Sequence, residues 1–385
     1  QVSGLLERAE ASGEQIIDGI PETFIGQQLA HLTAHEIGHS LGLRHNFKSS
    51  SIYTLEEVNS EDFKGVRANS GSVMDYLPTN WNVENGEIQG DFSMIGIGPY
   101  DIWAIEYGYT LGNPDEVLKR VGEPEHVYLT DEDTRGPDPL ARRYDFSADP
   151  HEYARSMMRL VDQQRERLLD EYVKDGDSWE RARKGYLRTL SMQRRMIDMM
   201  ANWIGGTYVN RVHKGDPNTG DPLVPVEVEK QREALAFIVE HAFRDEAFGI
   251  TPELLNKMTI RKWAGGMRGE STWPVVEQIG AAQGLAATPV MNPGTLSRVY
   301  NNEMRVEAGE DALPLPELIG TMFDAVYDEL LDARPDGDFT DREPMISALR
   351  RNLQADMTDR LIAIATNRAR LARPVRQQCL FFLRK

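Results

Sequence analysis

The stretch "LTAHEIGHSLGLRHNF", residues 32–47, places three histidines and one glutamate within eleven positions. On an α-helix each residue advances by about 100°, so His35 and His39 lie one turn apart on one face and can converge on a metal ion. Glu36 lies about 100° round from His35, where its carboxylate can reach a water molecule beside that ion. The spacing therefore predicts a helix that carries two metal ligands and a general base.

A catalytic zinc site needs a third protein ligand and keeps its fourth position open. If the helix ends near Gly42 and this glycine adopts a positive φ, the chain can turn sharply and return His45 to the ion. A straight helix would carry His45 to another height and face. We therefore predict that His35, His39 and His45 hold one catalytic zinc ion. A downstream glutamate such as Glu106 is the alternative third ligand, and the glycine at position 42 argues against it.

Three other features bear on metal binding. His31 extends the same helical face by one turn but fits no position of the pattern, so we interpret it as an ordinary helix residue. The single cysteine, Cys379, excludes an internal disulfide and a thiolate-rich zinc site. An acidic group further along could bind Ca²⁺ through its oxygens, or could be a solvated acidic linker. Its members are Asp131, Glu132, Asp133 and Asp138, with Asp145 and Asp149 nearby.

Length and charge set the broad class of protein. A chain of 385 residues exceeds what one hydrophobic core usually supports, which favours two domains. The 61 acidic and 43 basic residues give a net charge of -18, which argues against a nucleic-acid partner. No apolar run is long enough for a transmembrane segment. The N-terminus lacks the features of a signal peptide, so we expect either a cytosolic protein or a piece of a longer one.

Helical patterns dominate the chain, and the predicted fold is mainly α. A first helix pattern lies within residues 14–45, with Pro21 suited to the first helical position. Residues 46–98 are rich in turn-forming side chains, and a second helix is predicted over 98–109. Amphipathic patterns then recur at 150–175, 178–203, 227–244, 294–308, 315–332 and 342–370. The predicted domains are a zinc-binding portion over 1–112, a linker over 113–149 and a helical domain over 150–385.

Two further motifs join the histidines in a known pattern. "HEIGHSLGLRH" resembles the extended zinc signature, HExxHxxGxxH, of the metzincin metallopeptidases. "SGSVMDYLP", residues 70–78, is similar to the methionine-containing turn of that group, the Met-turn. The resemblance implies that Met74 forms an apolar floor beneath the histidines and that Tyr76 supports the oxyanion. "GPYDIWAIEYGY", residues 98–109, is similar to the closing helix of metzincin catalytic domains, with Asp101 as its typical acidic residue.

These stretches together resemble a family of large, mostly bacterial, zinc-dependent metalloproteases with a helical C-terminal region. The resemblance implies a zinc metalloendopeptidase in which Glu36 is the general base toward a zinc-activated water. It also implies a peptide or protein substrate, one catalytic zinc ion as cofactor, and a secreted or periplasmic location.

The resemblance also shows where this chain departs from the metzincin pattern. In metzincins a β-sheet that aligns the substrate precedes the zinc helix, whereas only residues 1–21 precede it here. We therefore expect this chain to be the C-terminal portion of a longer enzyme, with an upstream segment of the same protein as its partner. Such a portion would bind zinc and cleave peptides poorly. It would leave apolar helix residues such as Phe24 and Leu32 uncovered unless another chain or segment packs there.

A competing hypothesis is a helical interaction or scaffold module with a structural, non-catalytic zinc ion. Structural zinc sites are closed by four protein ligands. The sequence offers three well-placed histidines, with Asp75 as the nearest candidate for a fourth ligand and Tyr76 as the second. Serine-protease chemistry finds no support, because no G-x-S-x-G motif is present.

Overall fold

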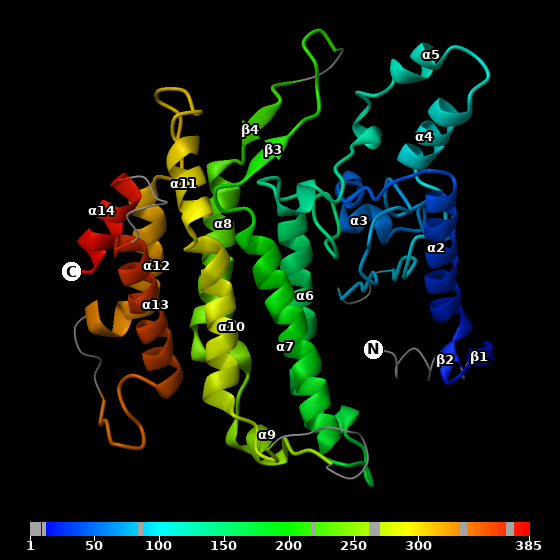
Figure 1. Ribbon diagram of the computed structural model, residues 1–385. Coiled ribbons are helices and arrows are strands. Elements are labelled where there is room, and N and C mark those ends of the chain that lie inside the picture. The colour runs from blue at the N-terminus through cyan, green and yellow to red at the C-terminus, as the bar shows by residue number, and fades with distance from the viewer. Residues whose placement is uncertain are drawn as a thin grey trace. The chain divides into compact units, whose positions relative to one another are not determined.

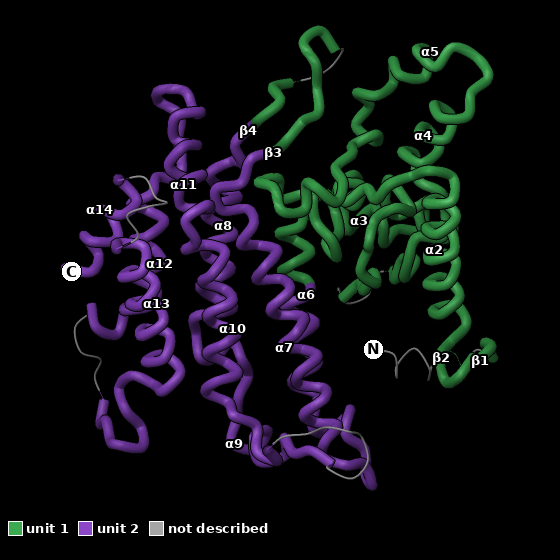
Figure 2. The backbone as a smooth tube through the Cα atoms, viewed as in Figure 1, with its two compact units in different colours: residues 1–156, 208–223 green, residues 157–207, 224–385 purple. Residues whose placement is uncertain are grey.

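The computed structural model describes residues 9, 13–83, 88–216, 220–261, 270–331, 337–366 and 373–385. The fold is mainly α, as predicted, and its described strands form two sheets of two strands each (Figure 1). The chain divides into two compact units (Figure 2). Unit 1 comprises residues 1–156 and 208–223, and unit 2 comprises residues 157–207 and 224–385. Among the described helices, none is both long and apolar enough to cross a membrane.

Unit 1 begins with a short hairpin that leads into the helix bearing the histidines. Strands β1 (Ile16–Ile17) and β2 (Ile20–Pro21) pair antiparallel. Their turn, Asp18-Gly19, has positive φ at both residues, which is the geometry that favours an Asp-Gly pair in tight hairpins. Helix α2 (Glu22–Ser40) follows directly, and Pro21 is its N-cap rather than its first helical residue as predicted. The helix thus begins one residue after the predicted position, and the hairpin precedes it within the predicted range 14–45.

The remaining elements of unit 1 are short, except for one helix that matches the predicted range. They are η1 (Ser49–Ile52), α3 (Leu55–Val58), α4 (Pro99–Tyr109), α5 (Pro114–Leu118), η2 (Pro124–His126) and η3 (Asp133–Arg135). Helix α4 was predicted over 98–109, and Pro99 occupies its first turn, where its missing N–H costs no hydrogen bond. A small core of Val73, Met74 and Met94 packs against Ala34 of α2 and against Leu43.

The segment 113–149, which the sequence predicts as a linker, lies within unit 1. Its backbone pairs with the loop after α2: the Phe47 N–H donates to the Leu129 carbonyl at 2.7 Å, and the Arg142 N–H donates to the Phe47 carbonyl at 3.0 Å. Lys48 forms a buried ion pair with Asp138 at 3.1 Å. These contacts bring a distant part of the chain to the loop that carries His45.

Unit 2 is a set of helices around its own core. Its helices are α7 (Glu180–Ala201), α8 (Val228–Ile238), α9 (Pro252–Lys257), α10 (Val275–Val290), α11 (Pro293–Asn302), α12 (Leu315–Leu331), α13 (Ala348–Thr366) and α14 (Arg373–Phe382). Helix α6 (Pro150–Glu166) leads into this unit. Between the longer helices lie two π-helical segments, η4 (Leu168–Tyr172) and η5 (Val239–Phe243), and one 3-10 helix, η6 (Asp245–Phe248). One core cluster gathers Leu168, Tyr186, Leu190, Phe248, Leu254, Met258, Trp273, Ile279 and Ala282.

Helix α10 was not predicted. It contains Pro289 and the glycines Gly280 and Gly284, which weaken a helical pattern in the sequence. The second described sheet pairs β3 (Thr207–Val209) with β4 (Leu223–Pro225).

Candidate metal centre

Helix α2 ends at Ser40, one residue after His39, and a hydrogen-bonded glycine turn follows it. Gly42 has a φ of 92°, a left-handed conformation that side chains rarely adopt. The Gly42 N–H donates to the His39 carbonyl, and the Leu43 N–H donates to the Gly38 carbonyl, both at 3.0 Å. This bond pair is the Schellman motif. The chain therefore reverses sharply at Gly42, as the sequence predicts, and His45 returns toward the helix.

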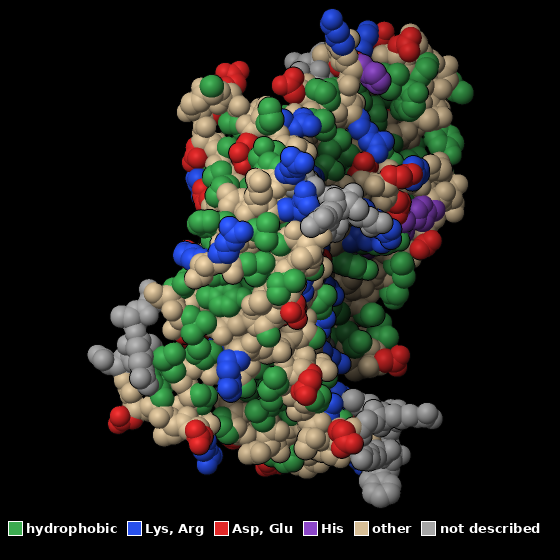
Figure 3. Space-filling model, turned by 60° about the vertical axis from the view of Figure 1, so that its left-hand side comes forward, with side chains coloured by type: hydrophobic (Ala, Val, Ile, Leu, Met, Phe, Trp, Pro, Cys, Tyr) green, Lys and Arg blue, Asp and Glu red, His purple; other side chains and the backbone are tan. Residues whose placement is uncertain are grey.

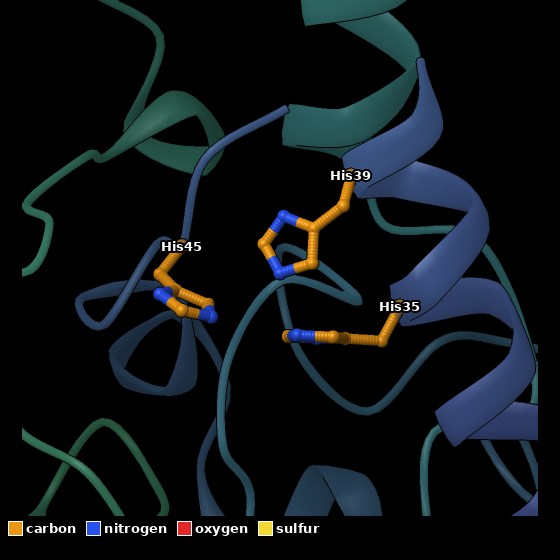
Figure 4. Close-up of side chains that lie close together, drawn as sticks. All are labelled: His35, His39 and His45. Atoms are coloured by element: carbon orange, nitrogen blue, oxygen red, sulfur yellow. The ribbon is translucent and has the colours of Figure 1, made fainter. Parts of the chain in front are cut away.

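The three predicted ligands lie together (Figure 4). His35 and His39 project from α2, and His45 approaches them from the loop beyond Gly42. The ring centroids are 4.7 Å apart for His35 and His39, 4.9 Å for His39 and His45, and 5.3 Å for His35 and His45. One ligand atom from each histidine lies within 4.8 Å of those of the other two. Zinc binds imidazole nitrogens at about 2.1 Å, so small ring movements allow one ion to bind all three.

Each histidine is held through its Nδ1 atom. The Nδ1–H of His35 donates to the Val73 carbonyl at 2.8 Å, and that of His39 donates to the Leu43 carbonyl at 3.0 Å. The Nδ1–H of His45 donates to Asp131 Oδ2 at 2.9 Å. Because these partners accept hydrogen bonds, Nδ1 carries the proton and Nε2 remains the ligand atom. Nε2 of His45 is buried and has no hydrogen-bond partner, which fits a metal ligand.

Burial and neighbouring charge favour the neutral imidazole of His35. The pKa of His35 is lowered, chiefly by burial and also by the neighbouring His39 and His45, against the raising effect of Val73 and Glu36. A neutral imidazole is the form that binds zinc. His39 and Glu36 are exposed, so the centre is open on the side of these two residues.

The predicted Met-turn lies against the same helix. Met74 is fully buried, and a Cβ atom on Gly38 would overlap its sulfur atom. Only glycine at position 38 therefore lets the methionine pack this close to α2. The Val73 carbonyl next to Met74 accepts from both His35 and His31, the latter at 3.2 Å. His31 also contacts Ser93, so its two ring nitrogens are occupied, in keeping with its interpretation as a helix residue.

Asp101 fastens the predicted Met-turn to helix α4. Its buried carboxylate accepts from the Ser72 hydroxyl, from the Val73 N–H at 2.7 Å and from the Gly98 N–H at 3.2 Å. Burial raises the pKa of this carboxyl group, and the three donors act in the opposite direction. Since Val73 in turn orients His35, the closing helix is connected to the metal centre by two consecutive hydrogen bonds.

Tyr76 lies beside the triad. Its ring centroid is 4.7 Å from that of His45 and 5.3 Å from that of His35. The Arg143 guanidinium lies over the Tyr76 ring at 5.7 Å and over the Phe47 ring at 4.8 Å. The structure thus brings the predicted oxyanion residue next to the metal ligands.

Asp131 and Arg143 are the residues near the centre that sequence reasoning did not assign to it. Asp131 was grouped with a possible calcium site, and Arg143 was not singled out. The acidic residues of that group instead pair with separate bases: Asp131 with His45 and Arg143, Glu132 with Arg44, Asp133 with Arg211, and Asp138 with Lys48. Among the described residues, the three histidines are the one group of metal-binding side chains close enough for a single ion, so calcium finds no support.

The other candidates for zinc ligands have different partners. Asp75 accepts from the Ser49 hydroxyl at 3.0 Å and from the Ser50 N–H at 3.1 Å. Glu106 forms an ion pair with Arg120. Within the described part of the chain, neither carboxylate belongs to the histidine group.

The apolar side chains of α2 differ in how well they are covered. Phe24, expected to be uncovered, packs against Trp81 and Phe92, with ring centroids at 5.6 Å and 5.2 Å. Another segment of the chain thus packs on Phe24, the case that the expectation excepted, because Trp81 and Phe92 lie beside the start of the helix. Leu32 is exposed as expected, and so are Leu29 and Ile37, each with more than half of its surface accessible.

Comparison with protein families gives one match of high coverage. A family profile described as Met-zincin matches residues 18–334, well over half of the chain. Comparisons with curated proteins and with solved structures found no match. The matched range contains the histidine triad and extends through most of unit 2, so the helical region is part of the family pattern. The resemblance read from the sequence motifs is confirmed, and the chain belongs to the Met-zincin family.

Proposed function

We propose that this protein is a zinc metalloendopeptidase with its metal on His35, His39 and His45. The observation that carries the proposal is the arrangement of the ring nitrogens. Every Nδ1–H donates to an oxygen acceptor, which leaves three Nε2 atoms for one ion. Three neutral nitrogen ligands with an exposed side suit a catalytic rather than a closed structural zinc site.

The residues around the triad have distinct proposed roles in peptide hydrolysis. Zinc, when bound, supplies Lewis acidity that polarises a peptide carbonyl and activates a water molecule. Glu36, exposed and adjacent to His35 on α2, takes the proton of the attacking water and passes it to the leaving amine. The Tyr76 hydroxyl donates a hydrogen bond to the carbonyl oxygen as negative charge develops on it.

The proposed substrate is a peptide or protein chain that binds from the open side of the triad. Acidic and basic side chains are interspersed on the face shown in Figure 3. The net charge of -18 disfavours nucleic acid as a partner. We also propose that an upstream segment of the same protein covers the exposed apolar side chains of α2, and that the enzyme acts outside the cytoplasm, as its family resemblance implies.

Metal analysis of purified wild-type protein and two variants tests the assignment. His39→Ala should lose zinc, because two histidines bind the ion far more weakly than three. Glu36→Gln should keep about one zinc per chain and lose peptide cleavage, because the amide accepts no proton. Zinc retained in full by His39→Ala would contradict the ligand assignment. Turnover retained by Glu36→Gln would contradict the base, and a four-ligand zinc site in a crystal structure would favour the scaffold alternative.

A further inference from the structure

We propose that Asp131 and Arg143 form a positioning pair that fixes the third zinc ligand, His45. This inference rests on the proposed zinc site. One carboxylate oxygen of Asp131 accepts from His45 Nδ1 at 2.9 Å, and the other accepts from Arg143 Nη2 at 3.0 Å. Arg143, Asp131 and His45 therefore form a continuous chain of charge-assisted hydrogen bonds that ends at a zinc ligand.

His45 depends on such a partner more than the other two histidines do. Helix α2 positions His35 and His39, and these two histidines donate to the backbone carbonyls of Val73 and Leu43. His45 lies on the loop beyond the helix end, and its acceptor is a side chain 86 residues away. A carboxylate acceptor both orients an imidazole and increases its basicity as a ligand. The position of Asp131 thus sets the direction of Nε2 of His45.

Arg143 is held in place on both sides by the backbone. The Arg142 N–H donates to the Phe47 carbonyl at 3.0 Å, and the Tyr144 N–H donates to the Tyr76 carbonyl at 2.9 Å. The Arg143 side chain lies over the Phe47 ring, which itself stacks on His45 with centroids 5.0 Å apart. These contacts restrain the guanidinium where it meets Asp131.

Arg143 holds the Asp131 carboxylate in its orientation. The Asp131 side chain is 38% exposed, so without a second partner its carboxylate could rotate toward water. The hydrogen bonds from His45 and Arg143 instead engage both carboxylate oxygens of Asp131. Asp131 and Arg143 act through His45 and are positioning residues.

Zinc affinity measured by competition with a chelator tests this pair on the whole chain. Asp131→Ala should weaken zinc binding about 10-fold to 100-fold, the range expected when the partner of a ligand histidine is removed. Asp131→Asn keeps an acceptor for His45 and should lose less. The matched control is Glu132→Gln, which removes the neighbouring negative charge. Glu132 pairs with Arg44 at 2.8 Å and with no ligand histidine, so the control should change affinity by less than about threefold.

A second measurement reports the geometry of the metal ligands rather than the affinity for the metal. With Co²⁺ in place of zinc, the visible absorption spectrum reports the ligand arrangement, and it should change in Asp131→Ala and in Arg143→Gln but not in Glu132→Gln. Arg143→Lys, which keeps the charge, should preserve more of the wild-type spectrum than Arg143→Gln. Circular dichroism of every variant checks folding, and the near-isosteric Asp131→Asn carries the test if Asp131→Ala does not fold.

The outcomes separate this inference from the proposed function. If wild-type protein binds no zinc, or if His45→Ala binds it as tightly, both are overturned. If His45→Ala loses zinc while Asp131→Ala and Asp131→Asn match Glu132→Gln in affinity and spectrum, only the positioning pair is overturned.

Discussion

Gly38 lies one residue before His39 on helix α2 and faces the buried side chain of Met74. A Cβ atom at this position would overlap the methionine sulfur, so the two residues are matched in size. The core cluster that contains Met74 packs against Ala34, next to His35 in the chain, and against Leu43. The close contact sets the spacing between the metal-bearing helix and the turn beneath it.

Gly38→Ala should therefore destabilise the protein, although alanine is the better helix former. Overpacking of a filled core costs about 1–3 kcal/mol, and displacement of Met74 should also weaken zinc binding. The control is Gly26→Ala on the same helix, where the nearest atom lies at an ordinary 3.5 Å. That change should stabilise by about 0.5–1 kcal/mol. Urea unfolding of both variants checks the prediction, and equal effects of the same sign would refute it.

At the scale of elements, helix α4 and the turn over 72–74 are joined through the first turn of the helix. Asp101 accepts three hydrogen bonds there, two of them from Ser72 and Val73. The Val73 carbonyl then accepts from His35. A change in α4 should for this reason alter metal binding, although no atom of the helix need contact the ion.

Asp101→Ala should leave two buried N–H groups and one hydroxyl without an acceptor. Each unsatisfied buried donor costs about 1–3 kcal/mol, so a loss of at least about 2 kcal/mol in the free energy of unfolding is expected, with weaker zinc binding. Asp115→Ala is the control, because Asp115 occupies the first turn of α5 and is exposed. Thermal unfolding and chelator competition measure the two effects. A variant as stable as the control would show that the turn does not depend on α4.

At the scale of the whole molecule, the stability should depend on pH through a buried pair of carboxyl groups. Asp75 and Asp145 are each 1% exposed, and the hydrogen bond from the Tyr144 N–H to the Tyr76 carbonyl brings their neighbours together. Burial raises the pKa of Asp75 to about 7. Burial and the nearby charge of Asp75 raise the pKa of Asp145 as well. The folded protein thus holds protons that the unfolded chain releases above about pH 4.

The free energy of unfolding should consequently fall as pH rises from about 4 to about 7, because the folded state binds more protons over that range. Asp145→Asn carries no charge and can donate to Asp75, so it should flatten this slope and raise stability at pH 8 by at least about 1 kcal/mol. Asp62→Asn, in an exposed loop, is the control. Urea unfolding at several pH values measures the slope, and an unchanged slope in Asp145→Asn would contradict the prediction.

The exposed apolar side chains of α2 are expected to affect the rate of peptide cleavage. Leu29, Leu32 and Ile37 are 55%, 57% and 53% exposed, on the helix that carries two of the proposed zinc ligands. Alignment of the substrate accounts for several kcal/mol of catalysis, and this chain offers no long strand among its described residues to supply it. We expect the chain alone to bind zinc and cleave casein slowly, and a longer form of the protein that covers this face to cleave faster. Equal rates would show that the chain needs no such cover.

The sequence by itself determined which three histidines come together and where the helix that bears two of them ends. The helical repeat places His35 and His39 on one face, and Gly42 supplies the conformation that returns His45. These relations span a few residues, so local geometry fixes them. The mainly α fold and the start of α2 to within one residue were predictable for the same reason, although the hairpin that the Asp-Gly turn over 18–19 makes before the helix was not.

Only the tertiary structure decided which groups hold those ligands in place. Val73, which accepts a hydrogen bond from His35, lies 38 residues from it in the chain. Asp131, which accepts a hydrogen bond from His45, lies 86 residues from it. The segment 113–149, which is polar and rich in turns, was predicted as a linker, yet its backbone pairs with the loop after α2. Contacts between distant segments follow no repeat along the chain. They arise when the folded backbone brings matching donors and acceptors together, which a single sequence does not display.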